Sequence, residues 1–212
     1  MLSAAGLKVA EYDGRKTRGL RDVGPIKGDL CHHIEGPAQG NMPSLDPILN
    51  RRPDLRRPLA QLGLGRDGTY YVLAAGFCQH AVSGSWQGII TGNTSFIGIE
   101  AENTGLPGDS PWPDVQMDAY RCRVTAIFSH LNLAAEFCVG HKESAQPLGR
   151  NDDPDFDMED FRDAVAAHLA GTVPPLPLIP TRELATGGAS GGPPCGAVPL
   201  ADWSGLFKTN MG

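Results

Sequence analysis

The sequence predicts an α/β fold in which a single mixed β-sheet is flanked by helices. Short apolar or β-branched runs alternate with longer helical segments, and an Asp-Gly turn at residues 67–68 joins two of the runs. Two longer segments carry apolar residues at three- and four-residue steps, which is typical of amphipathic helices. Strands that intermix with helices in this way build a sheet whose faces the helices cover.

Four strands are expected in chain order. Residues 28–34 form a short strand that ends in a histidine pair. Residues 59–64 and 70–74 flank the Asp-Gly turn and form a hairpin. Residues 95–101 are mostly apolar, which favours a central position in the sheet, where both faces are covered.

Three helices are expected. Ser44 can cap a short helix that has Pro47 in its first turn. The clearest helix covers residues 114–133, with Asp114 as its cap, and its apolar stripe consists of Tyr120, Val124, Ile127, Phe128 and Leu131. Another helix covers residues 157–169, with acids in its first turn and Gly171 at its end.

The two ends of the chain differ from its middle. Residues 1–27 are mixed and punctuated by glycine, so they are expected to form an arm packed on the domain. Residues 28–173 hold the predicted elements and form the main domain. Residues 174–212 are rich in proline and glycine, cannot build a core, and are interpreted as a linker and a C-terminal tail.

Composition excludes several classes of protein. The chain has 212 residues, is 41% hydrophobic and carries a net charge of −6, which argues against nucleic acid as its main partner. No apolar stretch approaches the roughly 18 residues of a membrane span, and no secretory signal is visible. The 5 cysteines are odd in number and scattered, so reduced thiols are expected.

Two separated segments carry the side chains that a metal site uses. Residues 31–34 read Cys-His-His-Ile, and residues 140–143 read Gly-His-Lys-Glu, followed by a polar loop that ends at Asp153 before a proline. Two imidazoles and one carboxylate are ligands of the kind that a catalytic zinc uses, with a fourth position left for water. His32, His141 and Asp153 are therefore candidate zinc ligands, provided that the two segments meet in space.

Four motifs follow one another between residues 28 and 170. They are His32-His33-Ile34, then His80-Ala81-Val82 with Gly84-Ser85-Trp86, then Asn93 with Ile97-Gly98-Ile99-Glu100-Ala101-Glu102-Asn103, and finally Gly140-His141-Lys142-Glu143 with Gly149-Arg150-Asn151-Asp152-Asp153-Pro154. In this order they resemble the zinc-dependent N-acetylmuramoyl-L-alanine amidases, a superfamily that includes phage lysozyme-type amidases and peptidoglycan recognition proteins. The chain looks most like endolysins of phages that infect actinobacteria. The resemblance implies the fold of this superfamily and an amidase catalytic domain over residues 28–173.

The resemblance implies which residues bind one zinc ion. His32 is preferred to His33 because the first histidine of the pair is the ligand in relatives, and His33 is then expected to pack or to support the site. His141 is the second ligand. Asp153 is preferred to Asp152 because the family's third ligand stands directly before proline.

The resemblance also implies the catalytic groups. Glu100 matches the strand glutamate that orients or deprotonates the attacking water in many relatives, and a carboxylate beside zinc can accept that proton. Glu102 shares its direction on a strand, because alternate residues share a face. Substrate binding or a surface charge is the alternative for Glu102. Glu143 is a weaker rival base, for which a solvated loop charge is the alternative.

One position departs from the family pattern. Asn151 stands where relatives often carry a lysine that stabilises the oxyanion, and the loop from His141 to Asp153 is about two residues longer than usual. An asparagine donates a hydrogen bond but brings no positive charge. The sequence leaves open whether Asn151, Arg150 or Lys142 stabilises the oxyanion.

The resemblance implies a substrate and a setting. His80, Trp86 and Asn93, with Lys142 and Arg150, are expected to bind the muropeptide, although core packing is the alternative for Trp86. The bond cleaved is the amide between N-acetylmuramic acid and L-alanine of the stem peptide, so the partner is bacterial peptidoglycan. A monomer is expected, without nucleic acid or membrane insertion. It would be made in the host cytoplasm and reach the wall after a holin opens the membrane.

Two other functions are compatible with parts of the sequence. Some members of the superfamily bind peptidoglycan without cutting it, and Asn151 would favour this second hypothesis. A cysteine peptidase is the third, with Cys31 or Cys78 as nucleophile and His80 or His141 as base. Neither cysteine lies at a helix start beside a clear positive partner, which a low-pKa thiolate requires.

Overall fold

The computed structural model describes residues 2–50 and 58–172, so the expected linker and tail over residues 174–212 lie outside the described residues. Its centre is one six-stranded sheet in the order β1-β4-β3-β5-β2-β6. Neighbouring strands run parallel except for β3 and β4, which are antiparallel. The predicted α/β fold with a single mixed sheet is therefore confirmed. The strands are β1 (Val9–Glu11), β2 (Gly28–His33), β3 (Leu62–Leu64), β4 (Tyr70–Val72), β5 (Phe96–Ala101) and β6 (Cys138–Gly140).

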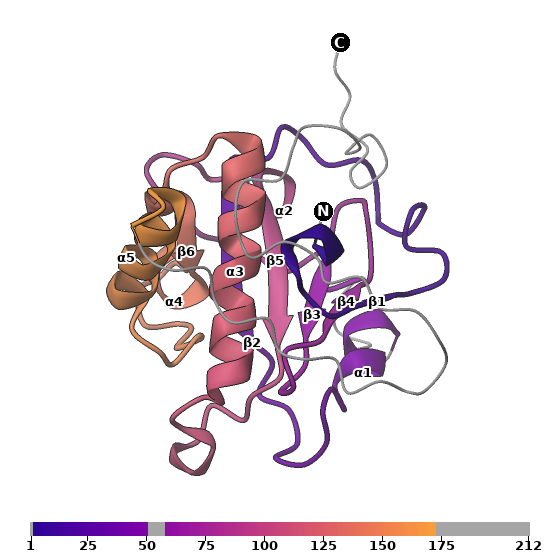
Figure 1. The fold of residues 1–212 in the computed structure, drawn as a ribbon. Helices are drawn as coiled ribbons and strands as arrows, with labels where there is room; N and C mark the ends of the chain where they lie inside the picture. Colours follow the sequence, from indigo (N-terminus) through magenta and orange to yellow (C-terminus); the bar gives the residue numbers. More distant parts are fainter. Residues whose placement is uncertain (1, 51–57, 173–212) are drawn as a thin grey trace.

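Helices and short turns connect these strands. The α-helices are α1 (Leu45–Leu49), α2 (Gly92–Ser95), α3 (Asp114–Leu131), α4 (His141–Ser144) and α5 (Met158–Leu169), and the short 3-10 helices are η1 (Ser3–Ala5), η2 (Pro107–Asp109) and η3 (Ala135–Phe137). In Figure 1, α3 crosses in front of β5 and β2, and α5 lies beside it near β6. None of the helices in the described part of the chain is both long and apolar enough to span a bilayer.

The main core lies between the sheet and the helices α3 and α5. It contains the apolar stripe predicted for α3, of which Tyr120, Val124, Ile127 and Phe128 are buried. Phe161 of α5 packs edge-on against Tyr120, with ring centroids 5.3 Å apart. The hydrophobic effect on this face thus fixes both helices on the same side of the sheet.

The ends of the helices differ in part from the expectation. Asp157 caps α5 as the acidic start predicts, because its carboxylate accepts hydrogen bonds from the backbone N–H groups of Glu159 and Asp160. Asp114 is the first residue of α3 and not its cap, because Pro113 occupies that position. Ser44 precedes α1 but makes no capping bond.

The two central strands set the direction of the histidine pair. β5 lies between β3 and β2, as its apolar sequence predicts, and His32 pairs with Glu100 in the β2–β5 register. Alternate residues of a strand face opposite sides, so His32 and Glu100 share the face away from α3. His33 points to the other face, where its ring lies 6.2 Å from that of Trp112.

The N-terminal residues and the cysteines add two findings. Residues 1–27 contribute β1, which pairs with β4 at one edge of the sheet.

Cys31, Cys78 and Cys138 are buried free thiols. Cys122 is disulfide-bonded, so the expectation of reduced thiols is wrong at this position.

Candidate metal centre

Three chain segments bring the predicted ligands together at one edge of the sheet. His32 lies near the end of β2, and His141 follows β6 directly as the first residue of α4. Because β2 and β6 are parallel neighbours, their carboxyl ends lie side by side. Asp153 reaches the same place from the loop between α4 and α5, where the N–H of Lys142 donates to the Asp153 carbonyl at 2.7 Å.

The three side chains form a tight cluster. Nδ1 of His32 lies 3.0 Å from one carboxylate oxygen of Asp153, and Nδ1 of His141 lies 3.0 and 3.1 Å from its two oxygens. The rings of His32 and His141 have centroids 4.5 Å apart. One ligand atom from each residue lies within 4.8 Å of the others, and all three residues are buried.

The protonation states suit metal binding. Burial and the nearby His141 lower the pKa of His32 to about 4, although Asp153 acts in the opposite direction. Burial alone would raise the pKa of Asp153, but hydrogen bonds with His141 and His32 outweigh it and hold the pKa of the carboxyl well below its usual range. Neutral imidazole and ionised carboxylate are the forms in which these groups bind metals.

A groove of about 660 Å³ opens onto the cluster. Glu100 lies on its wall, beside His32 in the register of the two central strands. The structure thus brings the candidate base to the candidate ligands. Residues 150–153 also line the groove.

The two candidates for oxyanion stabilisation in the 150–153 loop both line the groove. The side-chain amide of Asn151 donates to Asp153 at 3.3 Å. Arg150 donates through Nε to Asn151 at 3.1 Å and through Nη1 to the carbonyl of Gln146 at 3.1 Å. Among the described residues that line the groove, Arg150 is the only arginine or lysine.

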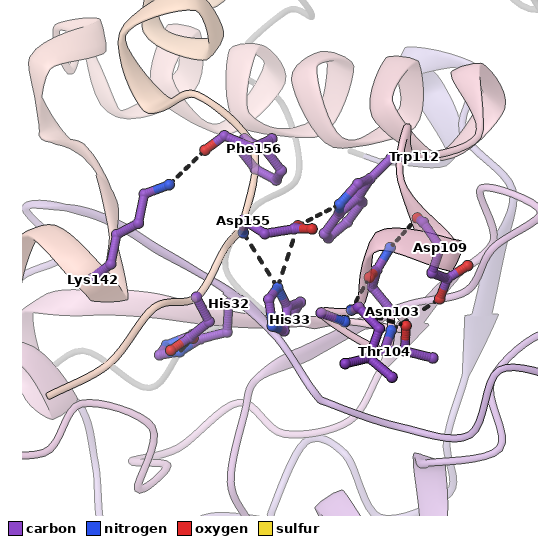
Figure 2. Close-up of polar contacts among 12 residues, drawn as sticks. His32, His33, Asn103, Thr104, Asp109, Trp112, Lys142, Asp155 and Phe156 are labelled. Carbon is purple, nitrogen blue, oxygen red and sulfur yellow. Dashed lines mark hydrogen bonds and ion pairs between the residues drawn. The ribbon is translucent and has the colours of Figure 1, made fainter. Parts of the chain in front are cut away.

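Lys142 lies elsewhere. Its ammonium donates to the backbone carbonyl of Phe156 at 2.7 Å, on the far side of the ligand loop, as Figure 2 shows. It is absent from the described lining of the groove. The contact indicates that Lys142 anchors the loop, and its expected role in substrate binding stays a prediction.

The three other residues predicted to bind substrate, His80, Asn93 and Trp86, occupy different positions. His80 lines the groove and is buried, with Nδ1 lying 3.4 Å from Nε2 of His32. Asn93 holds the backbone of that loop, because its side-chain oxygen accepts from the N–H groups of His80 and Ala81 at 2.9 and 2.6 Å. Trp86 lines a smaller apolar pocket next to His141 and donates to the carbonyl of Glu136 at 3.0 Å, which indicates packing.

The structure distinguishes among the three glutamates considered as bases. Glu102 is fully buried and accepts from the Ser44 N–H at 3.0 Å and the Ser44 hydroxyl at 2.9 Å, so it is neither a surface charge nor exposed to substrate. Glu143 accepts two hydrogen bonds from Arg162, at 2.8 and 2.9 Å. Glu100 is the one that lines the groove among the described residues.

Sequence reasoning missed Glu35 and Asp155 near the site. His33, Glu35 and Asp152 form a second group of possible ligand atoms, but Glu35 and Asp152 are exposed. Asp155 was missed entirely, although it contacts His33. The Asp-Pro-Asp pattern at residues 153–155 was the available signal, because a polar residue two positions after a ligand can fix the same loop.

Geometry also argues against a cysteine nucleophile. Cys31 is fully buried, and its position next to His32 in β2 places it on the opposite face of the sheet. Burial raises the pKa of the Cys78 thiol well above its ordinary value. Neither sulfur is therefore placed to act as the nucleophile at the groove.

The sheet and its helices have the fold of solved N-acetylmuramoyl-L-alanine amidases. AmpD, solved as a selenomethionine derivative, matches with a TM-score of 0.55 and 23% identity over 76% of this chain and 94% of its own. AmiD from E. coli, in complex with the substrate anhydro-N-acetylmuramic acid-L-Ala-D-gamma-Glu-L-Lys, matches with a TM-score of 0.54 and 20% identity over 70% of this chain and 61% of its own. The amidase LysC from Clostridium intestinale matches with a TM-score of 0.54 and 17% identity over 74% of this chain and 95% of its own.

The chain belongs to the N-acetylmuramoyl-L-alanine amidase family Amidase_2, whose model matches residues 22–156. That range contains the three candidate ligands and Glu100. No curated protein sequence matches the chain.

Proposed function

We propose that this protein is a zinc-dependent amidase that cleaves the bond between N-acetylmuramic acid and L-alanine of the peptidoglycan stem peptide. The observation that carries the proposal is the convergence of His32, His141 and Asp153 at the base of the groove. Membership of the amidase family supports the reaction, and AmiD, which has a similar fold, was solved with a muropeptide as its substrate.

The residues present fit a zinc ion. Two imidazole nitrogens and a carboxylate oxygen form the kind of donor set that catalytic zinc uses, and three protein ligands leave a position for water or substrate. The cluster is buried, and the low pKa of His32 keeps its ring unprotonated at neutral pH. We therefore assign zinc to these three residues and not to the more exposed group of His33, Glu35 and Asp152.

Zinc, when bound, polarises the scissile carbonyl and favours loss of a proton from the attacking water. Glu100 stands beside His32 on the groove wall, where its carboxylate can accept that proton and return it to the leaving amine. Arg150 brings the positive charge that Asn151 lacks, and both face the groove. Asn151 then acts mainly by orienting the Asp153 carboxylate.

The setting we propose is that of a phage endolysin. LysCS of Clostridium intestinale, an endolysin amidase, has a similar fold and supports this setting. The chain would act as a monomer on peptidoglycan of the host, reaching it from the host cytoplasm after a holin-type opening of the membrane. Residues 28–173 would be the catalytic domain, residues 1–27 an arm on it, and residues 174–212 a linker and tail.

A wall-lysis assay combined with metal analysis tests the proposal. Purified protein should contain one zinc per chain and should clear a suspension of purified cell walls, and a chelator should abolish the clearing until zinc is restored. His141→Ala should lose both the metal and the lysis, whereas His168→Ala on the half-buried side of α5 should keep both. Lysis that persists without metal would refute the zinc assignment, and a zinc-loaded protein that binds walls without cutting them would favour the non-catalytic binder.

A test of the bond cleaved completes the experiment. The products should show new amino termini of L-alanine and no new reducing sugar ends. Release of reducing ends would contradict the amidase reaction, because that is the product of a glycosidase.

A further inference from the structure

The residues that follow the third ligand wrap around the end of β2. His32 and His33 point to opposite faces of the strand, and each contacts a different residue of the Asp153-Pro154-Asp155 segment. Nδ1 of His32 lies 3.0 Å from the Asp153 carboxylate, and Nδ1 of His33 accepts a hydrogen bond from the backbone N–H of Asp155 at 3.3 Å. The segment thus contacts the strand from both sides.

The Asp155 side chain is itself fixed. Its Oδ1 accepts a hydrogen bond from Nε1 of Trp112 at 2.6 Å, as Figure 2 shows. Trp112 is 6% exposed and packs edge-on against Phe156, with ring centroids 5.1 Å apart. This hydrogen bond joins the segment to a buried aromatic side chain and so restrains it.

Lys142 also restrains the segment, at the carbonyls of Asp153 and Phe156. Its backbone N–H donates to the Asp153 carbonyl and its ammonium donates to the Phe156 carbonyl, both at 2.7 Å. The backbone between residues 153 and 156 is therefore held by β2, by the residue after His141 and by Trp112. These contacts fix the backbone from which the Asp153 carboxylate reaches the two imidazoles.

We propose that Asp155, held by Trp112 and His33, is a positioning residue that sets the Asp153 carboxylate for metal binding. The inference rests on the proposed zinc site. Groups that orient a metal ligand typically change metal affinity or activity by about 10- to 100-fold when they are replaced. Asp155 does not need to touch the ion or the substrate to have this effect.

Zinc affinity, measured by competition with a chromophoric chelator, tests the proposal. Asp155→Ala removes the acceptor for Trp112 and should weaken zinc binding by about 10- to 100-fold. Asp155→Asn keeps an acceptor oxygen and should restore most of the affinity. Trp112→Phe keeps the ring packing but removes the donor, so it should weaken binding in the same direction. Asp163→Ala, an exposed acid on α5, serves as the matched control and should bind zinc like the wild type.

The outcomes separate the two proposals. A wild-type protein that binds no zinc would overturn the proposed function and this inference with it. A wild type that binds one zinc while Asp155→Ala and Trp112→Phe bind it equally tightly would overturn the positioning role alone. Thermal unfolding of the metal-free variants separates positioning from general stability: a lower melting temperature without a loss of zinc affinity would also overturn it.

Discussion

Replacing Gly98 by alanine tests how closely β5 packs against the histidine loop beside the metal centre. Gly98 lies in β5 on the same face as Glu100, and an added Cβ would lie 2.4 Å from Cγ of His80. The ring would have to retreat by about 1 Å, because ordinary contact begins at 3.4 Å. His80 has little room to do so, since it is 5% exposed and Asn93 holds its backbone N–H at 2.9 Å.

The expected cost follows from this overlap. Overpacking a well-packed interior typically destabilises a protein by about 1–3 kcal/mol. For a domain of this size, each kcal/mol corresponds to about 2–4 °C in melting temperature, so Gly98→Ala should lower it by about 2–12 °C. The substitution should also reduce wall lysis, because the displaced His80 ring no longer lies 3.4 Å from His32.

Thermal unfolding of the wild type, Gly98→Ala, His80→Ala and the double variant checks the reasoning. Because His80→Ala removes the obstructing ring, adding Gly98→Ala to it should cost far less than in the wild type. The coupling energy should reach about 1 kcal/mol or more. Gly108→Ala, with no heavy atom within 4 Å of the added Cβ, is the matched control. A melting temperature of Gly98→Ala equal to that of Gly108→Ala, or additive effects in the double variant, would refute the argument.

Three further predictions concern packing and charge. Trp86→Phe should lower the melting temperature by about 2–4 °C, since it removes one hydrogen bond of about 1 kcal/mol, and should leave the KM for wall fragments unchanged; a raised KM would instead indicate sugar contact. In metal-free protein, burial lowers the pKa of His32 from 6.5 to about 4, so the folded state binds fewer protons than the unfolded chain in this window. The free energy of unfolding should therefore fall between pH 6.5 and 4, and denaturant titrations should show a shallower fall for His32→Asn. Burial raises the pKa of Asp29 to about 6 despite its buried ion pair with Arg123, so Asp29→Leu with Arg123→Met should keep or raise the melting temperature; a lower melting temperature would contradict this.

Much of the fold follows from local sequence. The Asp67-Gly68 turn specifies the β3–β4 hairpin, and the antiparallel register brings Leu64 opposite Tyr70. Asp157 specifies the start of α5, because a carboxylate at this position satisfies N–H groups that the helix leaves free. The three- and four-residue spacing of apolar residues specifies the buried stripe of α3. These features depend on residues within a few positions of one another, so one sequence reveals them.

The residue types of the metal centre could also be predicted from the sequence, because zinc chemistry requires imidazole and carboxylate ligands whatever the fold. Their convergence could not, since it depends on β2 and β6 lying side by side although more than a hundred residues separate them. In the sequence, only the order of the four motifs indicated that these residues come together.

Only the tertiary structure decided which groups face the groove. Glu100 lies in β5 and Glu102 follows the end of that strand, yet Glu102 is buried against Ser44, a residue distant in the chain. Lys142 follows the candidate ligand His141 directly, yet its ammonium donates to the Phe156 carbonyl. The sequence by itself determined the elements and the chemistry of the ligands. The roles of neighbouring charged residues were decided by burial and by long-range partners, because a charged side chain takes whichever partner the packed chain places within reach.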